Sequence, residues 1–170
     1  MLCCLLNLKI GTQINADDAD FLIGVWMYKK PEFKGVLYKH SDLTEKIIGA
    51  FYAVYSVLGY GFLEAVYAKA LEIELIKREL IPVFEKPIEV YDSGQLIGKH
   101  YADIVVNDLV ILELKAAKTL LVEHEAQLLN YLKATSYEVG LLLNFGPKPE
   151  TKRRSFDNSR KEWLIAKNSS

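Results

Sequence analysis

From Ser41 onward, apolar residues recur at helical spacing for about forty residues and then alternate as strands do. Asp42 and Glu45 have the spacing of a capping box, which predicts a helix of about four turns. Glycines then break the pattern, and a second helix is predicted from about Phe62 to Leu80. The expected inward positions are Leu43, Ile47, Ile48, Phe51, Val54, Tyr55 and Leu58, followed by Leu63, Val66, Tyr67, Ala70, Leu71 and Leu75.

The following residues have the pattern of strands interrupted by one helix. The predicted elements are strands at 88–91, 97–106 and 109–114, a helix at 123–134 and a buried strand at 140–145. Asn107 and Asp108 are turn formers, so the second and third strands are expected to form a hairpin. The order of helix, helix, strand, strand, strand, helix, strand predicts an α/β domain with a small mixed sheet flanked by helices.

The same pattern predicts three parts along the chain. Residues 1–40 show little periodicity and form an extension of undetermined structure. The domain is expected at 41–147, where two prolines end the compact part. Residues 148–170 are polar and basic and are expected to form a tail.

Composition narrows the possible functions. Of the 170 residues, 51% are hydrophobic and 25% charged, as in globular proteins. The formal net charge is −1, so no global basic field indicates nucleic acid, although a local basic rim and a bound metal would suffice. Cys3 and Cys4 have neither zinc-ligand spacing nor the number needed for a disulfide framework. No export signal or membrane-spanning apolar run is recognisable, so we expect a cytoplasmic protein without a membrane segment.

Residues 103–115 carry the pattern most suggestive of chemistry. Asp103 lies in one apolar segment, and Glu113-Leu114-Lys115 ends the next. In a strand, residues two apart share a face, so Glu113 and Lys115 would lie together. Burying such an ion pair costs several kcal/mol per ion unless partners or a metal compensate. The pattern therefore predicts a metal and phosphate site at the edge of a sheet.

The length of the hairpin turn is a geometric condition for this site. A two-residue turn at Asn107-Asp108 would pair Asp103 with Leu112 and place Asp103 and Glu113 on opposite faces. A shared metal needs them together. We therefore predict a three-residue loop that includes Leu109, or a bulge in one strand.

Two short motifs, the residues of 103–115 and the order of elements together resemble a known family. The segment from Gly61 through Glu64 to Tyr67 matches the signature of the small GxxExxY proteins, which are placed in the PD-(D/E)XK nuclease superfamily. Over about residues 41–147, the order of elements is also similar. The pair Gln127 and Tyr131 resembles the Q-x-x-x-Y motif of the RecB-type branch.

The resemblance implies a role for each site residue. Asp103 and Glu113 look like the metal-binding pair of the superfamily, and Lys115 like its catalytic lysine. One departure is that Ala102 replaces the proline that names the motif. This change affects backbone geometry rather than ligand chemistry.

The chemistry of these residue types agrees with such roles. Mg²⁺, for which Mn²⁺ can substitute, takes carboxylate, carbonyl and water oxygens, here from Asp103, Glu113 and the Leu114 carbonyl. Lys115 would hold the attacking water and offset charge on the scissile phosphate. Glu64 would orient water or complete the shell of a second metal. Gln127 and Tyr131, one turn apart, would steady Lys115 or a phosphate. The candidate catalytic residues are therefore Glu64, Asp103, Glu113, Lys115, Gln127 and Tyr131.

Each motif also has an ordinary interpretation. Glu113 and Lys115 alone would more often form a solvated strand face. Glu64 alone would be a carboxylate at the rim, paired with Lys69 or another base. Gln127 and Tyr131 alone would more often be residues that pack the helix. Their joint occurrence in order favours a metal-dependent nuclease acting on DNA or RNA. The alternatives are a catalytically silent nucleic-acid-binding module on the same fold, or an accessory protein that uses the apolar residues 21–28.

Overall fold

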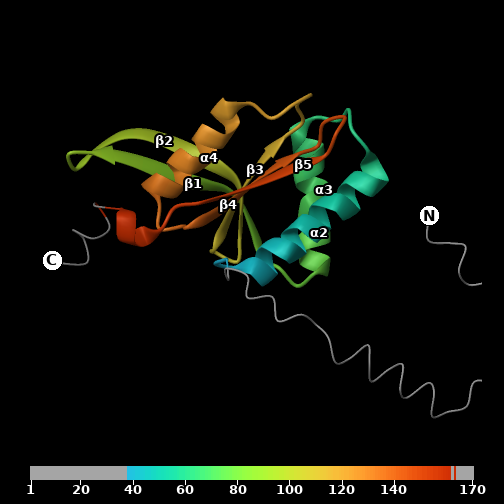
Figure 1. Cartoon of the computed structure of the whole chain (residues 1–170), viewed down its shortest axis with the longest axis horizontal. Helices are drawn as coiled ribbons and strands as arrows, with labels where there is room; N and C mark the ends of the chain where they lie inside the picture. The colour runs from blue at the N-terminus through green and yellow to red at the C-terminus, as the bar shows by residue number, and fades with distance from the viewer. Residues whose placement is uncertain (1–37, 162, 164–170) are drawn as a thin grey trace, which may run out of the picture. The chain divides into compact units, whose positions relative to one another are not determined.

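A five-stranded sheet with helices on both faces forms the domain (Figure 1). The computed structural model describes residues 38–161 and residue 163, so most of the predicted extension and the apolar residues 21–28 lie outside the described part. The elements are α2 (Ser41–Leu58), α3 (Glu64–Lys77), β1 (Pro82–Asp92), β2 (Gln95–Val106), β3 (Val110–Lys115), α4 (Val122–Ala134), β4 (Val139–Asn144), β5 (Glu150–Ser155) and the 3₁₀ turn η1 (Asn158–Arg160). No helix among these is long and apolar enough to cross a membrane.

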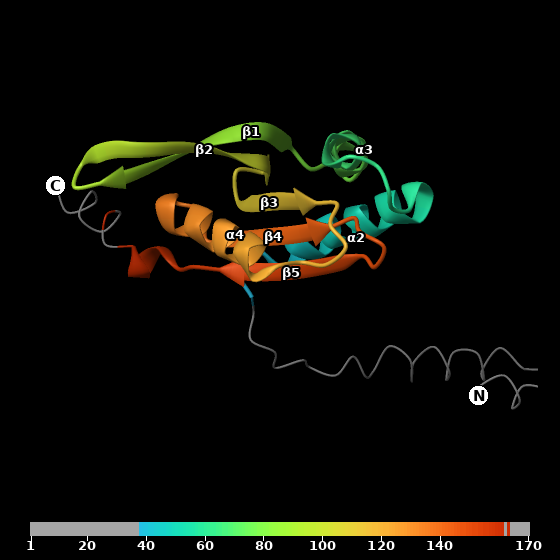
Figure 2. The same ribbon diagram turned by 90° about the horizontal axis from the view of Figure 1, so that it is seen from above.

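The strands lie in the order β1-β2-β3-β4-β5. β3 and β4, joined through α4, run parallel, and the other neighbouring pairs are antiparallel. Figure 2 shows α4 on one side of the sheet and α2 on the other, with the β1–β2 hairpin extending beyond the rest of the sheet. The sheet is therefore mixed and flanked by helices, as predicted.

The alternation of side chains along β3 separates two cores. Leu112 and Leu114 face α2 and α3, where they join a large apolar cluster. That cluster includes Phe145, against which the ring of Tyr67 stacks at 4.3 Å between centroids. Ile111 faces α4 and packs with Leu128 and other residues of the second cluster. Because strand residues two apart share a face, Glu113 and Lys115 follow Ile111 toward α4.

The fifth strand corrects the predicted boundary at Pro147. Glu150–Ser155 was expected to belong to a polar tail, but it pairs with β4 along its whole length. Every residue of this strand is polar, and most are half-buried. An edge strand needs few apolar side chains, so hydrophobic alternation does not reveal it.

Several local predictions also differ from the structure. Asp42 lies in the first turn of α2, whose N-cap is His40 without a side-chain cap, so the capping box is wrong. Leu63 and Val66 are exposed rather than inward-facing. β1 continues through Pro87, which pairs with Tyr101. Proline is tolerated there because β1 is an edge strand.

Candidate active site

The turn between β2 and β3 has the predicted length. Val106 pairs with Val110, which leaves a loop of residues 107–109. Asn107 and Asp108 both adopt positive φ, at 53° and 54°, a conformation that Asn and Asp tolerate better than most residues. The register continues to Ile104 and Leu112, the last pair of the ladder, so Asp103 and Glu113 are the next residues on the two strands. The three-residue loop is therefore confirmed.

Asp103 lies at the fork where β2 and β3 separate. The ladder between these strands ends at Ile104, and the Asp103 carboxylate replaces the next strand contact by accepting a hydrogen bond from the Leu114 amide at 2.7 Å. The ladder between β1 and β2 also skips Asp103, opposite Glu85 with its positive φ of 48°. Burial raises the pKa of Asp103, against the hydrogen bond from Leu114 and the charge of Lys115.

Glu113 is a buried carboxylate of which one oxygen is hydrogen-bonded and the other is not, among the residues described. Its side chain faces α4 and the residue is only 1% exposed. Oε1 accepts hydrogen bonds from Lys115 Nζ at 2.7 Å and Gln127 Nε2 at 2.8 Å, whereas Oε2 is buried and has no partner among the described residues. Burial, and then repulsion by Asp103, raises the pKa of Glu113 to about 7. Because Glu113 is only 1% exposed, it does not lie on a solvated strand face.

Lys115 is bonded to Glu113, and its charge also acts on Asp103. Burial, the largest influence, lowers its pKa, but the hydrogen bond and charge of Glu113 outweigh that effect, so the pKa of Lys115 is raised. The ammonium group is therefore charged at neutral pH. It faces the carboxylates of Asp103 and Glu113 with one positive charge, so this set becomes net negative as Glu113 ionises.

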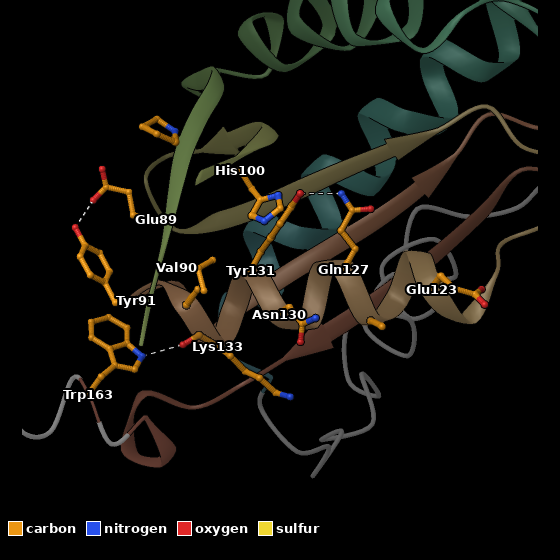
Figure 3. A pocket seen from close by; sticks show the side chains of 13 residues that line it. Glu89, Val90, Tyr91, His100, Glu123, Gln127, Asn130, Tyr131, Lys133 and Trp163 are labelled. Carbon is orange, nitrogen blue, oxygen red and sulfur yellow. Dashed lines mark hydrogen bonds between the residues drawn. The ribbon is translucent and has the colours of Figure 1, made fainter. Parts of the chain in front are cut away.

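Gln127 and Tyr131 join the site through Glu113. Gln127 Nε2 donates to Glu113 Oε1 at 2.8 Å. It also donates to the Tyr131 hydroxyl at 2.8 Å, and Figure 3 shows this second bond. Because Glu113 Oε1 also accepts from Lys115, Gln127 and Lys115 bond the same oxygen. The two α4 residues thus connect α4 to the acidic pair on the sheet, and their expected role toward Lys115 or a phosphate stays a prediction.

Glu64 reaches the site from the first turn of α3. Its Oε1 accepts a hydrogen bond from the Ala116 amide at 3.1 Å. Glu64 and Asp103 line one hollow of about 470 Å³, and the charge of Glu64 contributes to the raised pKa values of Asp103 and Glu113. The proximity predicted for Glu64 is confirmed, whereas Lys69 pairs with Glu72 rather than with Glu64.

The segment around Glu64 has a structural reason for its signature. Gly61 adopts a φ of 111°, which other residues rarely reach. The Tyr67 ring is fully buried, and its hydroxyl donates to the Gly59 carbonyl and accepts from the Phe62 amide. Tyr67 thus anchors the turn between the helices, and the anchored turn sets where Glu64 begins α3.

Backbone geometry provides a further candidate metal ligand beside the two carboxylates, the carbonyl oxygen of Leu114. The Lys115 carbonyl accepts from the Phe145 amide and so faces β4, while the Leu114 amide faces Asp103. Because the N–H and C=O of one strand residue point to the same side, the Leu114 carbonyl also faces Asp103. Within residues 38–161 and 163, no three His, Cys, Asp or Glu side chains form a ready metal site.

A hard cation such as Mg²⁺ fits this donor set. It is commonly held by one or two carboxylates, with water and substrate oxygens completing the shell. The partnerless Glu113 Oε2 and the net negative charge are what such an ion would compensate.

Asn144 is a buried site residue that the sequence analysis missed. Its Oδ1 accepts from the Ala117 amide at 3.0 Å and its Nδ2 donates to the Ala117 carbonyl at 2.9 Å. A Cβ on Gly146 would lie 1.9 Å from the same carbonyl, so only glycine allows this close approach. Both residues fix the segment that directly follows Lys115. The signal was an amide at the end of an otherwise apolar strand.

We expect Asn144→Ala to destabilise the protein by about 1–3 kcal/mol, because it leaves both polar groups of Ala117 without partners. Chemical unfolding at pH 7 measures this change. The segment after Lys115 should also become more susceptible to limited proteolysis. A variant as stable as wild type would show that water replaces the amide without loss.

The remaining polar residues of the region have ordinary structural roles. His124 Nδ1 accepts a hydrogen bond from the Leu121 amide at the start of α4, as a capping residue does. Asn107 Oδ1 accepts from the Ile81 amide, and Asp108 accepts from the Tyr137 hydroxyl. His100 is exposed, and its ring lies 5.9 Å from that of Tyr131.

The fold and the cluster together define an α/β protein whose acidic pair and lysine gather where two central strands separate. The family model of the PD-(D/E)XK nuclease superfamily matches residues 41–155, and the chain belongs to this superfamily. A solved structure titled "Crystal structure of SSO0001" is 21% identical and is similar over 76% of this chain and 67% of that chain, with a TM-score of 0.43. No curated protein matches the chain.

Proposed function

We propose that this protein is a Mg²⁺-dependent nuclease of the GxxExxY group that hydrolyses phosphodiester bonds of DNA or RNA. Membership of the superfamily supports nuclease-type chemistry on nucleic acid. The observation that carries the proposal is Glu113, a buried carboxylate beside Asp103 and Lys115, one oxygen of which has no partner in the described part of the chain. A purely structural acid would be expected to have both oxygens satisfied.

In this proposal Asp103, Glu113 and the Leu114 carbonyl would hold the metal, and Glu64 would orient a water or complete the shell of a second metal. When bound, the ion would supply Lewis-acid stabilisation of the phosphate oxygens. Lys115 Nζ holds the attacking water and offsets negative charge that develops on the phosphate. Gln127, backed by Tyr131, fixes Glu113 Oε1 and leaves Oε2 for the metal.

Cleavage of mixed nucleic acids tests the proposal. Wild-type protein is incubated with single- and double-stranded DNA and RNA in Mg²⁺, Mn²⁺ or EDTA. Cleavage that needs the metal and is lost in Asp103→Ala supports the nuclease. Metal should also raise the melting temperature of wild type but not of Asp103→Ala. Binding of nucleic acid without cleavage under any of these conditions would favour the silent module instead.

Glu64→Gln should reduce cleavage by about 10–100-fold while changing the free energy of unfolding by less than about 1 kcal/mol, since the amide can still accept from Ala116. Cleavage rate in Mn²⁺ and urea unfolding measure the two effects. Glu45→Gln, an exposed glutamate on α2, is the matched control and should leave both unchanged. Equal rates for the Glu64 variant and wild type would remove this carboxylate from the site.

Metal binding should depend on pH through Glu113. Since the pKa of Glu113 is about 7 without metal, a proton must leave when an ion binds below that pH. The apparent Mg²⁺ affinity should therefore fall about tenfold for each pH unit below 7 and change little above pH 8. Calorimetric titration at pH 6, 7 and 8 measures it. A pH-independent affinity would place the metal away from Glu113.

A further inference from the structure

A large groove separates α4 from the β1–β2 hairpin (Figure 3). Its volume of about 1440 Å³ exceeds the ~300–1,000 Å³ typical of sites for small molecules, so it suits an elongated ligand. Figure 3 shows Tyr91 and Trp163 toward one end, His100 and Tyr131 in the middle, and Gln127 toward the other end.

The groove borders the candidate active site through two residues of α4. Gln127 and Tyr131 both line it, and Gln127 Nε2 lies 2.8 Å from Glu113 Oε1. A ligand lying along α4 would therefore pass beside the residues that fix the acidic pair. A separate peripheral pocket would have no such connection.

Two aromatic rings in the groove are exposed and held in place. Tyr91 is 58% exposed, and its hydroxyl donates to Glu89 at 2.8 Å. Trp163 is 45% exposed, and its Nε1 donates to the Lys133 carbonyl at 2.9 Å. Because their polar atoms are already bonded, these rings offer flat faces rather than hydrogen-bonding edges. Such faces are stacking surfaces for nucleobases.

The charge of the groove narrows the ligand further. Among the described lining residues, Lys133 is a cation, whereas Glu89 and Glu123 are anions. Two phosphate backbones of a duplex would find little positive charge here. A single strand can turn its bases to the aromatic rings and leave its phosphates in water.

We propose that this groove binds an unpaired nucleic-acid strand, whose bases stack on Tyr91 and Trp163 while its backbone continues past Gln127 to the acidic pair. The inference rests on the proposed nuclease function and names its substrate class: single-stranded DNA or RNA, or a single-stranded end. Binding depends on stacking more than on phosphate contacts.

Fluorescence anisotropy in EDTA tests binding without cleavage. The probes are a labelled 20-nucleotide oligo-dT, an oligo-U of the same length and a labelled duplex. Tyr91→Ala and Trp163→Ala should each weaken single-strand binding roughly tenfold. Tyr101→Ala is the matched control, because this tyrosine is 53% exposed on the same hairpin but does not line the groove; it should bind like wild type.

Two further measurements separate stacking from other modes of binding. The slope of log Kd against log salt should be about 1 or less, as expected when a strand gives about 0.7 per neutralised phosphate. The chain has two tryptophans, Trp26 and Trp163, so in Trp26→Phe protein the emission reports Trp163 alone. Saturable quenching by oligo-dT supports stacking on Trp163. A duplex that binds as tightly as the single strand overturns the proposal, and so does a lack of any oligonucleotide binding, which would leave the groove to a peptide.

The cleavage assay distinguishes failure of this proposal from failure of the nuclease function. If wild type cleaves and the Tyr91 and Trp163 variants bind and cleave single strands like wild type, the groove proposal is wrong and the nuclease stands. If wild type cleaves nothing but these variants lose single-strand binding, the nuclease is wrong and the groove binds an unpaired strand without cutting it.

Discussion

At pH 8, Glu113→Gln should raise the free energy of unfolding of the metal-free protein by about 3 kcal/mol, and it should lower the cleavage rate in Mg²⁺ roughly 10³-fold or more. The stability gain arises because the folded protein raises the pKa of Glu113 from 4.5 to about 7. An ionised Glu113 therefore destabilises the metal-free fold. Glutamine keeps an oxygen acceptor for Lys115 and Gln127 but carries no charge to bury or to bind metal.

The dependence of this gain on pH identifies its cause. Below pH 4.5 the wild-type residue is neutral in both the folded and the unfolded state, so the variant gains nothing. The gain should grow as pH rises from 4.5 to about 7 and then stay constant. Urea unfolding at pH 4, 6 and 8 in EDTA measures it. A difference that is the same at all three values would mean that glutamine acts through packing, and wild-type cleavage by the variant would remove Glu113 from the chemistry.

Lys115→Ala should have the opposite effect on stability. Its side chain is 16% exposed, and it is the cation bonded to Glu113, so its loss leaves two carboxylates without a positive partner. We expect destabilisation by about 2–4 kcal/mol at pH 8 and less at pH 5, where Glu113 can take up a proton instead. Cleavage should slow by roughly 10²–10³-fold, while much of the Mg²⁺ affinity remains because Lys115 is not a metal ligand.

Lys118→Ala provides the control for this variant, since Lys118 is an exposed lysine three residues further along the chain. It should change stability by no more than about 0.5 kcal/mol and leave cleavage intact. Melting temperature in EDTA and cleavage rate in Mn²⁺ are measured for both proteins. If Lys115→Ala cleaves like wild type, Lys115 is not the catalytic lysine; if neither protein cleaves, the silent binding module becomes the better interpretation.

The sequence predicted the parts of this molecule that follow from hydrophobic periodicity and from the alternation of side chains along a strand. Side chains in a strand alternate, so the requirement that Asp103 and Glu113 meet was enough to predict a three-residue turn. Strong apolar periodicity likewise gave the helices and the central strands to within a few residues. The candidate site was predictable because its residues lie on these regular elements.

Features that depend on tertiary contacts were not predictable in this way. β5 has no apolar residue, and its sheet position depends on pairing with β4. Asn144 hydrogen-bonds to Ala117, which lies 27 residues away in the sequence, and hydrophobic periodicity does not predict such a contact. The hydrogen bond from Gln127 to Glu113 was not predicted either, because the distance from α4 to each strand residue depends on how closely the helix packs.

The parallel pairing of β3 and β4 also affects how fast the protein can fold. These strands are connected through α4, so Val110 meets Val139 only when the whole crossover closes. Chain entropy is lost in that step before the new contacts compensate, which makes such pairing slow. Glu113 lies between β3 and α4 and loses its water in the same event. Its charge therefore adds to the barrier to folding, and a Glu113→Gln protein gains its stability mainly through faster refolding.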